Sequence, residues 1–302
     1  MKKEIFQKIR KELPEAKRDV LLKNYTTFKI GGPAKYFFVA KTKDDLIKAI
    51  SVAKRFNLPF FILGSGSNIL ISDKGFKGLV IKNETRNFKI KKERIIAESG
   101  AIFDRIILNV IQAGLSGLEK GSGIPGTLGG AVYGNAGWPR GAWAIGDAVE
   151  SVTLLMPDGK IKKTDKKWFS FSYRNSRLKI IKGEKPVILE VILKLKKGKI
   201  KDLKKKRQEI LKKRVEKIPS GFSAGSIFIN PRQNTAGYLI EKCGLKGKKI
   251  GRVQISEKHA NFIVNLGEGK ARDVKKLINL VKKSVKNKFG IVLEEENQYL
   301  GF

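Results

Sequence analysis

The stretch 117-GLEKGSGIPGTLGGAVYGNAG-137 places eight glycines among 21 residues without forming a repeat. It lacks the apolar periodicity of a helix or a strand, and a loop of this length inside a compact domain is uncommon unless it has a function. Because glycine loses more backbone entropy on folding than other residues, a run of glycines implies that something approaches the bare main chain closely. The stretch is therefore predicted to be an irregular loop that lies against a flat cofactor.

A second glycine-rich loop, Gly64–Asn68, follows the apolar run Phe60–Leu63, which is predicted to be a buried strand. Small residues at this place let successive backbone N–H groups converge on an anion such as a diphosphate. A dinucleotide-binding fingerprint would need a glycine in place of Ile69, followed by a helix, and a P-loop would need Gly-Lys-Ser/Thr. Alone, the loop would be interpreted as an ordinary tight turn; together with the first stretch, it favours ligand binding.

The remaining sequence mixes short helices and strands without regular alternation, which is typical of an α+β fold. Helical apolar spacing, with capping or stop residues at the ends, predicts helices over 42–57, 103–113, 200–217, 236–243 and 271–289. Strands are predicted over 60–63, 69–71, 79–81, 149–156, 160–164, 187–195, 261–266 and 291–302. A turn at Pro157–Gly159 joins two of these strands into a hairpin.

A chain of 302 residues is long enough for two domains. Its first segment, residues 1–23, is too polar for a signal peptide or a membrane span and is predicted to be a short amphipathic helix. Cys243 is the sole cysteine, so no internal disulfide or multi-cysteine metal site is expected, and no metal is predicted. These features predict a cytoplasmic protein that does not bind a membrane.

Lysine and arginine total 64 against 28 acidic residues, a net charge of +36. Such an excess is compatible with nucleic-acid binding, but the lysines recur in almost every segment instead of gathering on one arm or helix. We therefore interpret them as solvated surface residues and expect no nucleic-acid partner. The charge still favours phosphate-bearing small molecules by long-range attraction.

The glycine-rich segments belong to a larger set of motifs by which the chain resembles the UDP-N-acetylenolpyruvoylglucosamine reductase family. Members of this family are flavoenzymes that complete the UDP-muramic acid sugar in peptidoglycan precursor synthesis. The motifs occur in the family's order from residue 24 to the end. They are Asn24–Gly32, Leu63–Leu70, Gly123–Gly130 with Asn135–Gly137, Tyr173–Ser176, Ala224–Pro231, Ser256–Asn261 and Leu293–Gly301.

The resemblance implies an FAD-binding domain of the PCMH or vanillyl-alcohol-oxidase type, made of two α+β subdomains, followed by a smaller α+β substrate-binding domain. The expected boundaries are 1–23 for the helical segment, 24–197 for the FAD-binding domain and 198–302 for the substrate domain. FAD and NADPH are the implied cofactors. The implied cofactor-binding residues are Gly64, Ser65, Gly66, Ser67, Asn68, Gly123, Ile124, Pro125, Gly126, Thr127, Gly130 and Ala131.

The resemblance also assigns the chemistry. NADPH delivers hydride to the flavin, and the reduced flavin passes it to the vinyl carbon of UDP-N-acetylglucosamine enolpyruvate. Arg174 matches the family arginine that faces the substrate carboxylate, and Ser226 matches its proton donor. Glu296 matches the final catalytic glutamate, although Glu294 and Glu295 are adjacent and Asn297 stands where the family usually has an aliphatic residue.

Tyr173, Lys217 and Asn230 are the implied substrate-binding residues, with Lys217 facing the UDP diphosphate. His259 is expected to be a hydrogen-bonded structural residue. The chain has no room after 236–243 for the substrate-capping tyrosine loop of longer family members, so it is placed with the shorter type. We expect a monomer. The alternatives are a flavin-dependent alcohol oxidase of the same fold and a basic nucleic-acid-binding protein.

Overall fold

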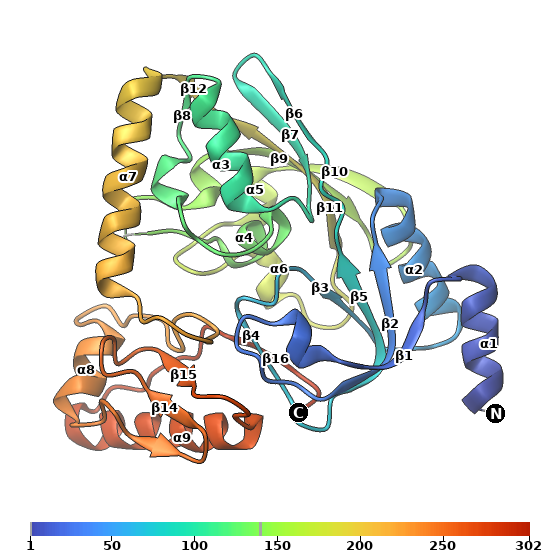
Figure 1. Cartoon of the computed structure of the whole chain (residues 1–302). Coiled ribbons are helices and arrows are strands. Elements are labelled where there is room, and N and C mark those ends of the chain that lie inside the picture. The colour runs from blue at the N-terminus through green and yellow to red at the C-terminus, as the bar shows by residue number, and fades with distance from the viewer. Residues whose placement is uncertain (1, 139–140) are drawn as a thin grey trace.

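The computed structural model describes residues 2–138 and 141–302 (Figure 1). The chain begins with helix α1 (Lys2–Glu12), followed by strand β1 (Lys17–Leu21). The expectation of a wholly helical segment 1–23 is therefore wrong in its second half. Strand β1 pairs antiparallel with β2 (Pro33–Ala40), so tertiary pairing overrides the charged local sequence and joins this segment to the first sheet.

The first sheet has the strand order β1-β2-β5-β3, where β5 (Phe76–Asn83) runs parallel to both β2 and β3 (Phe60–Leu63). Helix α2 (Lys43–Arg55) packs on it. The predicted capping box at the start of this helix is present, because Thr42 and Asp45 each bind the other's backbone N–H. The apolar face predicted for this helix is residues 46, 49, 50, 53 and 56; the first four are buried, and Phe56 is half-buried.

The second sheet is antiparallel, in the order β10-β9-β11-β7-β6. Its strands are β6 (Phe88–Lys91), β7 (Arg94–Glu98), β9 (Val149–Leu155), β10 (Ile161–Asp165) and β11 (Val187–Lys194). The predicted hairpin is confirmed as β9 and β10. Helix α3 (Phe103–Gln112) buries its predicted apolar face in the core of this subdomain. The two sheets are the two subdomains of the FAD-binding part.

The glycine-rich stretch 117–137 was predicted to be an irregular loop, but it contains helical structure. It holds a 3₁₀ turn (Glu119–Gly121) and helix α4 (Leu128–Gly134), whose N-cap Thr127 accepts from the N–H of Gly130. A Cβ on Gly129 would lie 2.9 Å from the Cβ of Ser99, so this glycine lets the helix approach the end of β7. Some of these glycines are therefore required by packing within the protein. The sequence pattern did not predict the helix because a glycine-rich segment has too few apolar residues to show helical spacing.

Helix α7 (Ile200–Lys217) runs along one side of the molecule and leads to the smaller C-terminal part (Figure 1). That part contains α8 (Ala236–Lys242), α9 (Ala271–Phe289) and a sheet of β13 (Lys249–Ile250), β14 (Val253–Ile255) and β15 (Ile263–Asn265). The predicted inward face of α9 is buried in its core. Only residues Cys243–Lys248 separate α8 from β13, in line with the shorter family type.

The last segment was predicted as one strand over 291–302, but regular pairing covers only β16 (Gln298–Leu300). Strand β16 pairs parallel with β4 (Ile69–Ile71), so the end of the chain returns to the FAD-binding part next to the loop Gly64–Asn68. Shorter elements are the 3₁₀ turns Leu22–Tyr25 and Ile145–Asp147, β8 (Leu115–Ser116), α5 (Lys166–Phe169), α6 (Arg177–Ile180) and β12 (Lys196–Lys197). Among the described helices, none is long and apolar enough to span a membrane.

Candidate active site

The two glycine-rich loops are in direct contact. A Cβ on Gly64 would lie 2.7 Å from the hydroxyl oxygen of Thr127, and the Ser67 hydroxyl donates a hydrogen bond of 3.0 Å to the carbonyl of Pro125. Strand β3 leads into the loop Gly64–Asn68, and the loop 117–127 leads into the N-terminus of α4. The fold therefore builds one continuous main-chain surface from segments that are far apart in the sequence.

This surface carries free donors. Within the described residues, the backbone N–H groups of Ser65, Gly66, Ser67, Gly126 and Thr127 donate to no protein acceptor. Buried donors are rarely left unpaired, so a half-buried set of them indicates an anionic ligand. The surface therefore suits an anionic group such as the diphosphate of FAD.

Not every glycine of the loops faces a ligand. A Cβ on Gly66 would lie 2.3 Å from the carbonyl oxygen of Tyr25, so this glycine is required by the chain's own packing. Gly130, by contrast, is exposed, and its nearest neighbour at a Cβ position is the Thr127 hydroxyl at 3.4 Å. Open space beside Gly130, at the start of α4, is where a bound group can lie against bare backbone.

Helix α7 fixes one end of the loop 117–127 through Asp104, on α3. One carboxylate oxygen of Asp104 accepts from the N–H of Gly123 at 2.8 Å, and Arg207 donates two hydrogen bonds of 2.7 Å to the same carboxylate. Burial alone would raise the pKa of Asp104, but the hydrogen bonds from Arg207 and Gly123 outweigh it and lower the pKa. Asp104 is therefore held as a carboxylate.

A second ion pair from α7 fixes the other end of the loop in the same way. Glu119 accepts from the N–H of Gly117 at 2.7 Å, and Lys206 approaches its buried carboxylate to 2.6 Å. Burial opposes ionisation of Glu119, while Lys206 and the Gly117 N–H lower its pKa. Neither ion pair, Asp104–Arg207 or Glu119–Lys206, was predicted from the sequence. A single acid, or a single cation in a lysine-rich helix, gives no local signal of its partner.

Arg174 lies in a tight turn. Ser172 and Asn175 exchange two backbone hydrogen bonds of 3.1 Å across it, and Arg174 adopts a left-handed backbone with φ of 56°. The turn is tied to the end of α4, since the Asn135 side chain donates to the Ser172 carbonyl at 2.7 Å and the Ser176 hydroxyl donates to the Tyr133 carbonyl at 2.6 Å. The arginine thus belongs to the same rigid unit as the glycine-rich loop.

Glu296 faces this arginine from the C-terminal segment. Its Oε1 lies 3.3 Å from Nε of Arg174, and the two side chains are 19% and 21% exposed. Nε of Arg174 is buried and makes no aligned hydrogen bond, so the guanidinium retains donors for a further anion. Burial raises the pKa of Glu296, while the positive charges of Arg174 and Lys179 act against that rise.

The two acids next to Glu296 are engaged elsewhere. Glu295 pairs with Lys282 at 2.8 Å and with Lys275 at 3.5 Å, and it accepts from the hydroxyl of Tyr299. Glu294 is exposed to solvent. Geometry therefore distinguishes among three adjacent glutamates that sequence spacing alone separated weakly.

Ser226 lies beside this pair through the main chain. The N–H of Glu296 donates a hydrogen bond of 2.8 Å to the carbonyl of Ile227, the residue after Ser226. Ser226 itself forms an isolated antiparallel β-bridge with Phe262. The buried Asn297 side chain donates to the carbonyls of Ala224 at 2.9 Å and Ser226 at 3.4 Å. Among the described residues, no partner occupies the half-buried Ser226 hydroxyl, which leaves it available to a ligand.

Two of the three predicted substrate-binding residues lie together. The Asn230 side-chain nitrogen is 3.4 Å from the hydroxyl of Tyr173, and its oxygen accepts from the N–H of Ala236. Lys217 is exposed at the last residue of α7, and no described contact joins it to the other two. Its assignment rests on the family resemblance alone.

Arg214, one turn before Lys217, was not singled out in the sequence. Its guanidinium lies 5.0 Å above the ring of Trp138, and its buried Nε has no hydrogen-bond partner among the described residues. Burial, with the nearby charge of Arg174, lowers its pKa to about 10. A Cβ on Gly123 would lie 3.1 Å from its Cδ, so Arg214 brings a second guanidinium to the glycine-rich loop.

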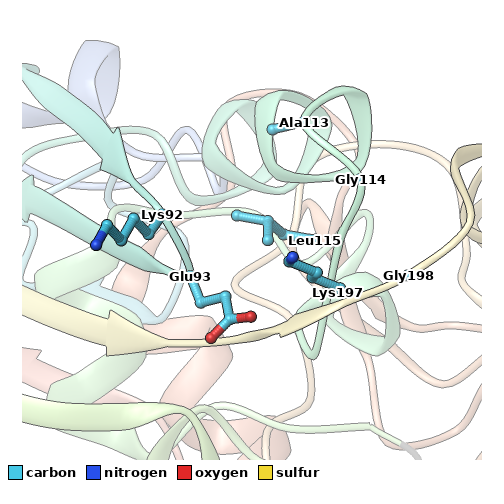
Figure 2. A pocket seen from close by; sticks show the side chains of 7 residues that line it. All are labelled: Lys92, Glu93, Ala113, Gly114, Leu115, Lys197 and Gly198. Atoms are coloured by element: carbon cyan, nitrogen blue, oxygen red, sulfur yellow. The ribbon is translucent and has the colours of Figure 1, made fainter.

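His259 has a structural role, as predicted: its Nδ1 accepts from the N–H of Asn261 at 3.2 Å, and its ring packs on Phe262. Figure 2 shows a separate pocket of about 520 Å³, lined by Lys92, Glu93, Ala113, Gly114, Leu115, Lys197 and Gly198. None of the predicted site residues lines that pocket. The candidate site is therefore the surface between the two loops and the Arg174–Glu296 pair.

Comparison with known proteins bears on this arrangement. Residues 34–165 match the family described as FAD binding domain, and residues 216–300 match the C-terminal domain of UDP-N-acetylenolpyruvoylglucosamine reductase. The protein of that name from Caldicellulosiruptor bescii is 46% identical over 94% of this chain and 90% of its own length. That from Thermotoga maritima is 43% identical over 90% of this chain and 94% of its own.

The solved structure of UDP-N-acetylenolpyruvylglucosamine reductase from Thermus caldophilus has a TM-score of 0.80 and 34% identity, covering 95% of this chain and 98% of that one. A variant of Phl p 4, a glucose oxidase, shares the fold alone, with a TM-score of 0.50 and 13% identity over 65% of this chain and 44% of the other. The chain therefore belongs to the UDP-N-acetylenolpyruvoylglucosamine reductase family, the FAD- and NADPH-dependent oxidoreductases whose fold it has.

Proposed function

We propose that this chain reduces UDP-N-acetylglucosamine enolpyruvate to UDP-N-acetylmuramate for peptidoglycan precursor synthesis in the cytoplasm. The observation that carries the proposal is the Arg174–Glu296 pair, which the fold ties to two contacting loops with free backbone donors. FAD, when bound, would supply the hydride-transfer chemistry between NADPH and the vinyl carbon of the enolpyruvyl group.

The free N–H groups of residues 65–67, 126 and 127 would hold the diphosphate of FAD. The bare start of α4 at Gly130 and Ala131 would lie against the rest of the cofactor, and Asn68, Gly123, Ile124 and Pro125 would line it. Lys82 adds positive charge at this loop, because its ammonium donates to the Gly64 carbonyl at 2.6 Å. The ion pairs from α7 would keep the loop 117–127 in its binding conformation.

Arg174 would bind the carboxylate of the enolpyruvyl group. Hydride addition at the vinyl carbon builds negative charge on the neighbouring carbon and its carboxylate, and a fixed cation stabilises that charge without reorganising. The guanidinium suits this task because it is planar and keeps donors besides the one facing Glu296. Arg214 adds a second positive charge close by.

Ser226 would donate the proton that completes the reduction at the adjacent carbon. A serine hydroxyl is a weak acid, so it can serve only a strongly basic carbanion in a shaped site. Glu296, whose pKa is raised by burial, would supply or stabilise the proton and orient Arg174. Tyr173, Asn230 and Lys217 would bind the UDP portion of the substrate.

Steady-state turnover tests the proposal. We expect the purified protein to be yellow, to consume one NADPH per enolpyruvyl sugar and to produce UDP-N-acetylmuramate, identified by mass spectrometry. An alcohol oxidase of the same fold would instead consume oxygen with an alcohol and ignore NADPH. A colourless protein whose only ligand is nucleic acid, bound in a salt-sensitive way, would contradict the proposal and favour the basic-protein alternative.

A further inference from the structure

The turn that presents Arg174 is held by a lysine. Arg174, with φ of 56°, has a left-handed backbone conformation. Residues other than glycine adopt this conformation at a cost in free energy, so the surroundings must stabilise it. The ammonium group of Lys179 reaches back from α6 and donates a hydrogen bond of 2.8 Å to the carbonyl of Arg174. This bond closes the turn from the side of the following helix.

Lys179 also bears on the charges of the site. Burial lowers its pKa, the carboxylate of Glu296 acts to raise it, and the guanidinium of Arg174 acts to lower it further. The same lysine acts against the rise in the pKa of Glu296. The positive charge of Lys179 therefore acts on Glu296 together with that of Arg174, and only Arg174 was identified from the sequence.

Lys179 is itself anchored to the glycine-rich segment. The ammonium group of Lys185 donates to the Lys179 carbonyl at 2.9 Å and lies 3.4 Å from the hydroxyl of Tyr133, on α4. Ser176 binds the carbonyl of the same tyrosine. A continuous set of hydrogen bonds thus runs from α4 through Lys185 and Lys179 to the backbone of Arg174.

We infer that Lys179 is a positioning residue for reduction of the sugar: its ammonium group holds the Arg174 turn by the bond to the Arg174 carbonyl, and Lys185 anchors it. This inference rests on the proposed function. A lysine that merely closed a surface turn would contribute to stability and would affect both half-reactions alike. A positioning lysine acts on the step in which Arg174 and Glu296 face the substrate and spares reduction of the flavin by NADPH.

The test is anaerobic stopped flow of flavin absorbance for Lys179→Gln and Lys179→Arg, with Lys182→Gln as a matched control. Lys182 is an exposed lysine of the same segment. For Lys179→Gln we expect flavin reduction within about twofold of wild type and reoxidation by the sugar slower by roughly ten- to a hundredfold, the scale of a small misplacement at a site. Lys179→Arg, which keeps a charged donor, should recover part of the loss, and Lys182→Gln should match wild type.

Reoxidation by Lys179→Gln at the wild-type rate would overturn the inference, as would equal slowing of both half-reactions with a lowered Tm. Wild type must be measured alongside, because failure of the sugar to reoxidise its flavin would remove the proposed function itself. Lys185→Met is a second variant that leaves the Lys179 charge in place. It should slow reoxidation less than Lys179→Gln, in the same direction, and an unchanged rate would contradict the anchoring role.

Discussion

Glu296 shows how one residue takes its protonation from its surroundings. Burial favours the neutral form of its carboxyl and outweighs the positive charges of Arg174 and Lys179. The pKa of Glu296 in the folded protein therefore lies above the usual value for glutamate. The folded state therefore binds a proton that the unfolded state has already released. Between these two pKa values, the free energy of unfolding decreases as the pH rises, because the folded state binds more protons than the unfolded state.

This sign gives a prediction for Glu296→Gln. The free energy of unfolding of wild type should fall relative to that of Glu296→Gln as the pH rises from the usual glutamate pKa through the raised one. Denaturant unfolding of both proteins at a series of pH values, at fixed ionic strength, measures the difference. A difference that is constant with pH, or that grows in favour of wild type as the pH rises, would contradict the raised pKa.

Single residues were predictable where a motif carried them. Arg174 and Glu296 were named from motifs and lie 3.3 Å apart, although distant segments supply them. Lys179 and Arg214 were not named, because one lysine or arginine among 64 cationic residues has no local signature. What distinguishes them is partial burial, the hydrogen bond from Lys179 to the Arg174 carbonyl and the charge effect of Arg174 on Arg214, which only the fold creates.

Among the elements, α7 was predicted at its observed bounds, but its task was not. The charged run that begins at Ile200 and the stop signal Pro219–Gly221 predict where this helix starts and stops. Its ion pairs to Asp104 and Glu119 depend on packing against α3 and the glycine-rich loop. Helix α4 was not predicted for a related reason. Its glycines show no apolar spacing, and the helix is stabilised by the burial of Leu128 and Val132, which depends on the fold.

The clamp from α7 predicts a change in cofactor affinity. Arg207→Gln removes both charged hydrogen bonds to Asp104, which then holds the N–H of Gly123 less firmly. We expect FAD affinity to fall by roughly tenfold, or about 1.4 kcal/mol, measured by titrating FAD into apoprotein and following fluorescence.

Lys204→Gln is the control for this change, because Lys204 is an exposed lysine of the same helix. It should leave FAD affinity unchanged. Equal affinities of Arg207→Gln and wild type would show that the loop keeps its conformation without the clamp.

At the scale of the whole molecule, the end of the chain joins the two parts. Strand β16 pairs with β4, and the buried Asn297 amide donates to the side chain of Asn68 at 2.6 Å and to the carbonyl of Ala224 at 2.9 Å. One side chain thus connects the loop of the FAD-binding part, the segment of Ser226 and the segment of Glu296. The family motif located these pieces, whereas a non-local parallel pairing of three residues has no signal in the sequence.

Asn297→Ala should therefore affect stability and both loops together. Three acceptors, the Asn68 side chain and the carbonyls of Ala224 and Ser226, lose their donor, which costs about 1–3 kcal/mol in the free energy of unfolding. We also expect weaker FAD binding and slower reoxidation by the sugar. Denaturant unfolding, FAD titration and stopped flow measure the three effects, with the exposed Glu294→Gln as control. A variant that lost stability but kept both activities would show that Asn297 supports packing alone.

Anaerobic stopped flow with two mixing steps tests the central claim most directly, that the joined loops and the Arg174–Glu296–Ser226 region act on one substrate. Mixing wild type with NADPH should bleach the flavin, and mixing next with UDP-N-acetylglucosamine enolpyruvate should restore its absorbance. Ser226→Ala should bleach at the wild-type rate and recover roughly 10²–10⁴ times more slowly. Bleached wild type that the sugar does not reoxidise, or a Ser226→Ala variant slowed equally in both steps, would contradict the account.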